Sequence, residues 1–189
     1  EFLDNIDLNT QLIPSFRIGL KKYYGPSKGL KESSFGEFIT VDTYFGKFIQ
    51  TGDYLYLHKL IACLYRPKQQ NFKNIKNTSD WNGDVREDFN DKIIDFRAEK
   101  ISKSLSLSHK WAILYFYYGF RENHVLRFEN LFEKKGKEEK RSGNDYGWAG
   151  VLMNLSGGAY GDYTETSKTN WFTLFVQMSK NIDDDLRNK

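Results

Sequence analysis

The densest group of side chains that could do chemistry is GDVREDFND, residues 83–91, which places four carboxylates within eight positions. These carboxylates belong to Asp84, Glu87, Asp88 and Asp91. Clustered acids of this kind serve in calcium loops and as the paired carboxylates of glycosidases. The acids here do not follow the alternate-position ladder of an EF-hand. Because acids also stabilise the first turn of a helix, we expect Asp84 to cap a helix over residues 84–105.

The histidines and the cysteine give no stronger signal for catalysis or metal binding. His58, His109 and His124 are far apart and form no HExxH or HxH pattern, so no metal site is predicted from them. Cys63 is the only cysteine, which excludes an internal disulfide and a cysteine-based zinc site. It lies within the apolar helical pattern HKLIACLYRP, which predicts a buried, inert thiol. No cofactor is expected.

The glycine-rich segment DYGWAGVLMNLSGGAYGDYTET, residues 145–166, could suggest a phosphate-binding loop. It matches neither the P-loop pattern nor the GxGxxG fingerprint, and the nearest downstream lysine is Lys168. Its apolar residues have helical spacing instead, which predicts a short packed helix containing Trp148, Val151, Leu152 and Leu155. We expect a left-handed helix cap and then a turn into the last helix, formed by Gly157 and Gly158 and by Gly161 with Asp162.

Charge and hydropathy bear on the partners of the chain. Among 189 residues, 28 are basic and 25 acidic, for a formal net charge of +3. The best run of interleaved basic and aromatic residues, the kind that binds single strands, spans residues 65–76. Acids neutralise most other stretches, so nucleic acid is not expected as a partner. No run of about 18 apolar residues occurs, so no membrane span is predicted.

The elements that must position these residues have helical periodicity, with apolar residues recurring at spacings of three and four. Besides the short helix near Trp148, the pattern predicts helices over residues 12–24, 33–49, 54–66, 84–105, 109–132 and 167–189. Ser34 with Glu37 has capping-box spacing, Gly52 suits a C-terminal cap and Asp53 can cap the next helix. Gly119 either divides or bends the helix over 109–132.

No segment alternates with a period of two, so no strand is predicted. The predicted fold class is all-α. We expect a single compact domain over residues 1–189, built of six or seven helices with long polar loops at 68–83 and 133–145.

Several phrases of the sequence, taken together, resemble a family of uncharacterised Bacteroidetes phage and prophage proteins that are encoded among tail genes. These phrases are KKYYGPSKGLKESSFGEFITVDTYFGKF, HKLIACLYRP, GDVREDFND, WAILYFYYGFRENHVLRF and DYGWAGVLMNLSGGAYGDYTET. The resemblance covers residues 20–180 or so and supplies no catalytic residue. It implies a role in the virion or in tail assembly.

The expected function is therefore that of a non-enzymatic phage or prophage structural or tail-assembly protein, located in the virion or in the host cytoplasm during assembly. Its partners would be other phage structural or tail proteins, or a second copy of itself. Because aromatic side chains dominate binding hot spots, the candidate interface residues are Phe72, Trp81, Tyr160 and Tyr163. The alternatives are a tape-measure chaperone that is absent from the mature particle, a nucleic-acid-binding module, or an enzyme.

Overall fold

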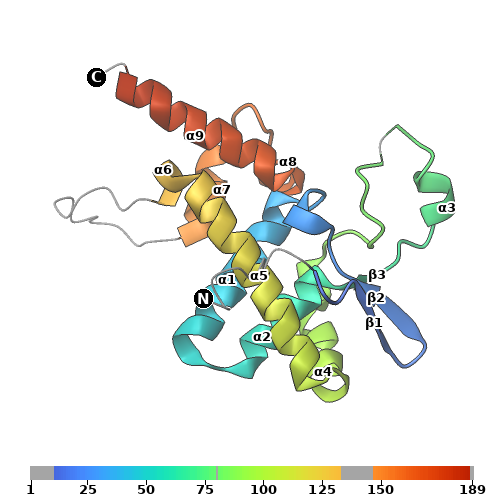
Figure 1. Cartoon of the computed structure of the whole chain (residues 1–189). Coiled ribbons are helices and arrows are strands. Elements are labelled where there is room, and N and C mark those ends of the chain that lie inside the picture. Colours follow the sequence, from blue (N-terminus) through green and yellow to red (C-terminus); the bar gives the residue numbers. More distant parts are fainter. Residues whose placement is uncertain (1–10, 80, 133–146, 188–189) are drawn as a thin grey trace.

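The computed structural model describes residues 11–79, 81–132 and 147–187, and it is mainly helical with one small sheet (Figure 1). The strands are β1 (Ser15–Ile18), β2 (Lys21–Tyr24) and β3 (Arg66–Pro67). The α-helices are α1 (Phe35–Thr51), α2 (Tyr54–Leu64), α3 (Phe72–Ile75), α4 (Ile94–Ser104), α5 (Leu107–Arg127), α6 (Glu129–Phe132), α7 (Gly147–Leu155), α8 (Tyr163–Lys168) and α9 (Trp171–Arg187). Two short 3-10 helices are η1 (Lys28–Leu30) and η2 (Asp91–Ile93).

The fold class is thus mainly α, and the prediction of a strand-free protein with six or seven helices was wrong in detail. The described residues hold nine α-helices and a three-stranded antiparallel sheet in the order β1-β2-β3. The single-domain organisation stays a prediction. The predicted loop at 133–145 lies outside the described residues.

The first predicted helix, residues 12–24, is a β-hairpin instead. Its strands meet at a two-residue turn in which Gly19 has a φ of 58°, a left-handed conformation that favours glycine and suits hairpin turns. Phe16 and Tyr23 are directly opposite each other, and their rings stack at 5.5 Å between centroids. Both side chains are buried. This cross-strand pair stabilises the hairpin, although its spacing in the sequence also suits a helix.

The helical hairpin α1–α2 agrees with the sequence prediction at its caps. Ser34 accepts a hydrogen bond from the backbone N–H of Glu37 at 3.2 Å, and Gly52 has the left-handed φ of 68° at the C-terminus of α1. Asp53 caps α2 through the N–H of Leu55 at 2.8 Å. The two helices pack on each other, and α4 packs on the opposite side of α2. These caps fix both ends of α1 and the start of α2.

The predicted helix over 84–105 begins only at Ile94, so Asp84 does not cap it. Residues 85–87 are extended beside β3: Gln69 donates its backbone N–H to the carbonyl of Val85, and Glu87 donates to the carbonyl of Pro67, at 3.1 and 2.8 Å. The carboxylate of Asp84 is occupied by arginines instead, as described below. The polar loop at 68–83 is present, but it contains the short helix α3.

The C-terminal elements match their prediction in part, since the last helix, predicted over 167–189, begins at Trp171 and a separate short helix, α8, precedes it. The short helix α7 forms, Gly157 takes a left-handed φ of 83°, and Asp162 begins α8 with a reciprocal capping box to Glu165. Gly158 does not have a positive φ, so the cap is formed by Gly157 alone. The predicted helix over 109–132 is two helices, because α5 ends at Arg127 and α6 begins at Glu129. The division lies at Phe128, and α5 runs unbroken through Gly119.

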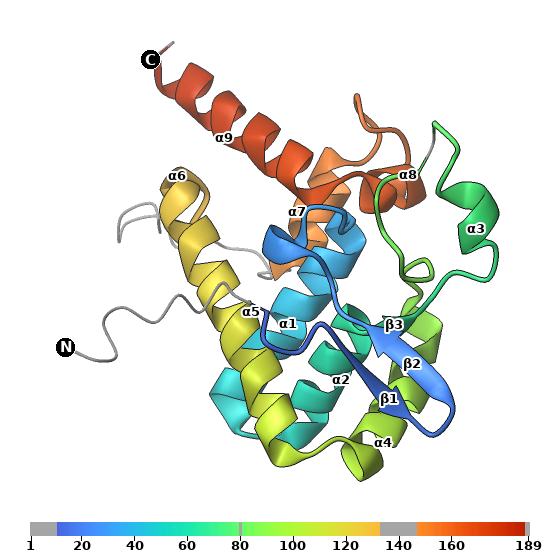
Figure 2. The same cartoon turned by 45° about the vertical axis from the view of Figure 1, so that its right-hand side comes forward.

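Aromatic side chains of α1, α5, α7 and α9 form one part of the core, and aliphatic side chains such as Leu57, Leu60 and Ile61 of α2 form another. The ring of Phe38 lies 5.3 Å from that of Trp171, 5.0 Å from Phe175 and 5.4 Å from Trp148, measured between centroids. Phe120 of α5 closes the group at 6.4 Å from Phe38. Large rings bury much apolar area each. The aromatic cluster therefore joins α1 to the C-terminal helices α7 and α9, which contact α1 and lie beside it in Figures 1 and 2.

Candidate functional site

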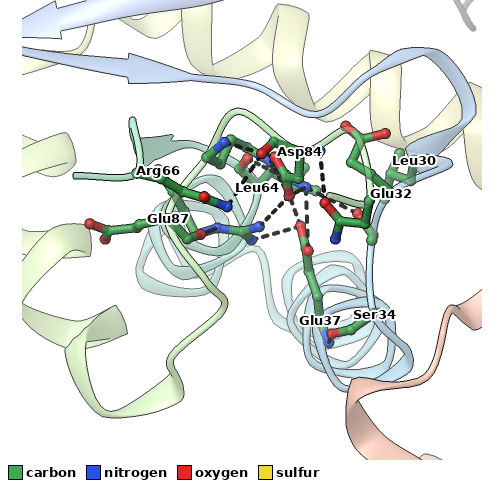
Figure 3. Close-up of polar contacts among 12 residues, drawn as sticks. Leu30, Glu32, Ser34, Glu37, Leu64, Arg66, Asp84 and Glu87 are labelled. Carbon is green, nitrogen blue, oxygen red and sulfur yellow. Dashed lines mark hydrogen bonds and ion pairs between the residues drawn. The ribbon is translucent and has the colours of Figure 1, made fainter. Parts of the chain in front are cut away.

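Within the described residues, two arginines and two carboxylates form a buried cluster that we call the ion cluster: Glu37, Arg66, Asp84 and Arg86 (Figure 3, where the first three are labelled). All four side chains are buried. Arg86 contacts the carboxylates of Glu37 and Asp84 at 2.8 Å each. Arg66 contacts the same two carboxylates at 2.8 and 3.1 Å. The charges of the four groups therefore balance.

Three separate elements bring these four residues together. Glu37 is in the first turn of α1, Arg66 directly follows α2 in β3, and the segment carrying Asp84 and Arg86 pairs with the end of β3. Asp84 also accepts the backbone N–H of Arg86 at 2.9 Å, which bends the chain locally. The ion cluster thus ties the long loop to the helical hairpin.

The guanidinium groups of the ion cluster also bond to the surrounding backbone. Arg86 donates to the carbonyl of Leu64 at 2.7 Å, and Arg66 donates to the carbonyls of Cys63 and Glu87 at 2.9 and 2.8 Å. Burial by itself lowers the pKa of Arg86, but the Glu37 and Asp84 carboxylates outweigh it and raise the pKa above its ordinary value. A buried charge is tolerated only when it is paired and hydrogen-bonded in this way. The ion cluster therefore positions the backbone and leaves Arg86 permanently charged.

The cysteine is buried and two of the three histidines are partly buried, whereas His109 is exposed at the start of α5, with its Nδ1 2.6 Å from the hydroxyl of Ser106. Cys63 is fully buried, as predicted, and burial raises the pKa of its thiol, so it is a poor nucleophile. The ring of His124 lies against Phe120 and Trp171, at 4.2 and 4.7 Å between centroids. Burial lowers the pKa of both His58 and His124. Within the described part of the chain, no group of three or more His, Cys, Asp or Glu side chains could hold a metal ion.

A second feature lies at the surface, where aromatic side chains of α2 and α5 form a band that we call the aromatic stripe: Tyr54, Trp111, Tyr115 and Tyr118. Tyr115 is 52% exposed and Tyr118 is 42% exposed. The ring of Trp111 is 6.5 Å from that of Tyr54 and 5.9 Å from that of Tyr115, between centroids. Tyr118 lies 6.3 Å from the buried Phe45. The stripe therefore rests on the core and still presents its rings to solvent.

The spacing of the sequence places the stripe on one face of α5. Residues 111, 115 and 118 are separated by four and three positions, so they share a face. The opposite face, with Ile113, Tyr117 and Phe120 among its members, is buried. The segment WAILYFYYGF is therefore apolar on both sides of the helix. A helix segment that is apolar all round is either fully buried or contacts a second partner, and this property of residues 111–120 is the sequence signal that indicates the stripe.

The four predicted interface residues fall in two places. Phe72 and Trp81 pack edge to face at 5.9 Å between centroids, and the indole of Trp81 donates to the carbonyl of Asp84 at 3.1 Å. These two rings therefore hold the polar loop against the ion cluster. Tyr160 is half-buried against the core, whereas Tyr163 is 53% exposed at the start of α8. Of the four, Tyr163 is the one whose side chain faces mostly solvent.

Comparison with known proteins identified no relative of the chain. It matches no protein-family model, no curated protein sequence and no solved structure. None of the helices within the described residues combines the length and the apolarity that crossing a membrane requires.

Proposed function

We propose that the chain is a non-enzymatic structural or tail-assembly protein of a phage or prophage, acting through protein–protein contacts. The aromatic stripe is the observation that carries this proposal. Tyrosine and tryptophan are enriched at interface hot spots because they combine a large apolar body with a polar tip. Contiguous exposed apolar side chains on a folded protein mark interaction surfaces. Tyr115 and Tyr118 are the residues we expect a partner to cover.

The ion cluster supports the non-enzymatic part of the proposal. Catalytic sites hold titratable groups whose altered pKa values leave them ready to exchange protons with a substrate. In the ion cluster the carboxylates of Glu37 and Asp84 are instead held by two guanidinium groups at 2.8 to 3.1 Å. Such an arrangement stabilises a loop and offers little to a substrate.

The resemblance of the sequence phrases to tail-region proteins of Bacteroidetes phages supports placing this interface in a particle or its assembly. Partners would be other tail or structural proteins, or a second copy of the chain. The location would be the virion, or the host cytoplasm while the particle assembles.

A complementation experiment tests the proposal. The gene is deleted from the phage or prophage that carries it, and tailed particles are counted by electron microscopy after complementation with variants. We expect the deletion to abolish tailed particles and the wild-type gene to restore them. The double variant Tyr115→Ala/Tyr118→Ala should fail to restore them while remaining folded. The matched control is Phe96→Ala, since Phe96 is an exposed aromatic residue of α4 outside the stripe.

Mass spectrometry of the purified particles refines the result. Presence at a fixed stoichiometry supports a structural part, and absence combined with loss of tails supports the tape-measure chaperone. Unchanged numbers of tailed particles after the deletion would contradict the proposal. Full complementation by the stripe variant would show that the interface lies elsewhere.

A further inference from the structure

A cavity of about 480 Å³ lies between the N-terminal turns of α1, the segment 82–91 and α8, directly beside the ion cluster. Its walls include Arg66 and the carboxylates of Glu37 and Asp84 from that cluster. Small-molecule and side-chain pockets span roughly 300 to 1,000 Å³, so this volume suffices for one large side chain or a small ligand. The ion cluster gives the cavity a fixed wall.

The remaining charges around the cavity are mostly negative. The ion cluster neutralises itself, so the other charged side chains that line the cavity, among the described residues, are Glu32, Asp88, Asp91 and Lys168. Glu32 accepts hydrogen bonds from the backbone N–H and the hydroxyl of Ser27. The carboxylates of Asp88 and Asp91 are exposed and have no hydrogen bond or ion pair with any residue in the described ranges. The cavity therefore favours a cationic occupant.

The shape and lining of the cavity favour an organic cation over a metal ion. The described residues hold no group of acids or histidines spaced for a metal, whereas two aromatic rings, Phe89 and Tyr163, line the cavity. Aromatic faces attract ammonium and guanidinium groups. A guanidinium also matches carboxylates in bidentate geometry and stacks on a ring, which an ammonium does less well.

We propose that this cavity binds the side chain of an arginine in a basic segment of a protein partner. The guanidinium would lie between the Asp88 and Asp91 carboxylates and the ring of Tyr163. This inference deepens the proposed function, since it gives the protein–protein contact a second point of attachment with a stated chemistry. It also assigns a role to Tyr163, which the aromatic stripe does not include.

A peptide titration on the purified full chain tests the inference. The probe is a Gly-Ser octapeptide with one central arginine, and the comparison is the same peptide with citrulline, an uncharged group of nearly the same shape. Binding is followed through the backbone amide resonances of Gly36 and Ser167, which line the cavity. We expect saturable shifts with the arginine peptide that weaken as salt is added, smaller shifts with a lysine peptide, and no shifts with citrulline.

Two matched variants make the test specific. Asp88→Asn/Asp91→Asn should weaken binding of the arginine peptide about three- to tenfold, because each exposed carboxylate contributes a modest attraction. Asp184→Asn/Asp185→Asn removes the same charge from exposed positions on α9 and should leave binding unchanged. Denaturation curves confirm that both variants are folded.

Three outcomes would overturn the inference: no shifts at the cavity, equal shifts with citrulline, or equal losses in the two variants. Each leaves the proposed function standing if the stripe variant still fails to restore tailed particles. Conversely, arginine binding with normal complementation by the stripe variant would uphold the cavity and contradict the role of the stripe.

Discussion

The ion cluster and the aromatic stripe reverse the usual distribution of side chains. In the ion cluster two arginines and two carboxylates are almost completely removed from water. In the stripe, the side chains of Tyr54, Tyr115 and Tyr118 are 40 to 52% exposed. Buried charge costs free energy unless it is paired, and exposed rings forgo the stabilisation that burial would give. The two regions therefore point to different purposes, one to holding the chain together and one to contact with another molecule.

The difference shows in what each side chain contacts. Arg86 bonds to α1, to the end of α2 and to its own loop, so its removal affects three elements at once. The ring of Tyr115 contacts that of Trp111, and about half of the Tyr115 side chain is exposed to solvent. We therefore expect substitutions in the ion cluster to change the free energy of unfolding, and substitutions in the stripe to change binding.

The largest effect is expected from Arg86→Met. The substitution leaves the Glu37 and Asp84 carboxylates buried with half of their positive partners, and breaking a buried ion pair in this way costs about 3 to 5 kcal/mol. Chemical denaturation of the purified chain gives the loss directly. Arg17→Met, in the exposed position of β1, is the matched control and should stay within about 0.5 kcal/mol of wild type. We call the ion cluster a structural clamp in the sense that it ties the long loop to the helical hairpin. A loss of unfolding free energy below about 1 kcal/mol in Arg86→Met would contradict this role.

A double-mutant cycle sharpens the same point. The double variant Glu37→Gln/Arg86→Met should lose less free energy of unfolding than the sum of the losses in the two single variants, since each substitution removes the partner of the other. We expect a coupling free energy of about 1 to 3 kcal/mol, measured by denaturation of all four proteins. The cycle between Glu37→Gln and Arg17→Met serves as the control, because these side chains share no contact among the described residues. Additivity in both cycles would contradict the clamp.

The sequence predicted the helical parts of this comparison better than the polar parts. The ends of α1 and the start of α2 are set by local contacts of Ser34, Gly52 and Asp53 with residues a few positions away. The spacing of these residues in the sequence therefore predicts where the helices begin and end. Glu37 and Arg86 are 49 positions apart, and neither has a local pattern that indicates its partner. Asp84 was assigned to a helix cap because acids before an amphipathic segment usually stabilise its first turn. In the structure, the pairing of residues 85–87 with the end of β3 brings Asp84 to the arginines instead.

The hairpin and the stripe show two further limits of periodicity. Phe16 and Tyr23 are seven positions apart, which fits one face of a helix as well as a cross-strand pair. Gly19 decides between them, because a left-handed turn at this position reverses the chain. The apolar spacing predicts a helix where α5 lies, but it does not distinguish Tyr117, which is buried, from its exposed neighbour Tyr118. The side that faces the core depends on α1 and α2, which lie far away in the sequence.

These neighbouring tyrosines allow the stripe to be tested with an internal control. Tyr118→Ala and Tyr115→Ala remove exposed rings, so the double variant should lose no more than about 1 kcal/mol of unfolding free energy. Tyr117→Ala removes a fully buried ring that donates a hydrogen bond to Asp42 at 3.2 Å, and a loss of about 3 to 5 kcal/mol is expected. Thermal and chemical denaturation compare the three proteins. A large loss in the double variant would mean that the stripe belongs to the core of the free protein.

The smallest expected effect concerns His124, whose ring packs against the aromatic core and contacts a backbone carbonyl of α5. Its Nδ1 is 2.7 Å from the carbonyl oxygen of Phe120, and burial lowers the pKa of its ring from the ordinary value of 6.5. The unfolded chain therefore takes up a proton at a higher pH than the folded chain. The stability that depends on the neutral His124 ring is fully present above about pH 6.5, and it declines as the pH falls from there toward the lower folded pKa.

Denaturation midpoints measured across this pH range test the contribution of His124. The midpoint should fall less steeply with decreasing pH in His124→Gln than in the wild type. His58→Gln removes the other histidine whose pKa is lowered, and it should reduce the slope independently. If the pH dependence of the midpoint is the same in His124→Gln as in the wild type, His124 has the same pKa in the folded and unfolded states. The folded protein would then hold the charged ring beside Phe120 and Trp171 without a loss of stability.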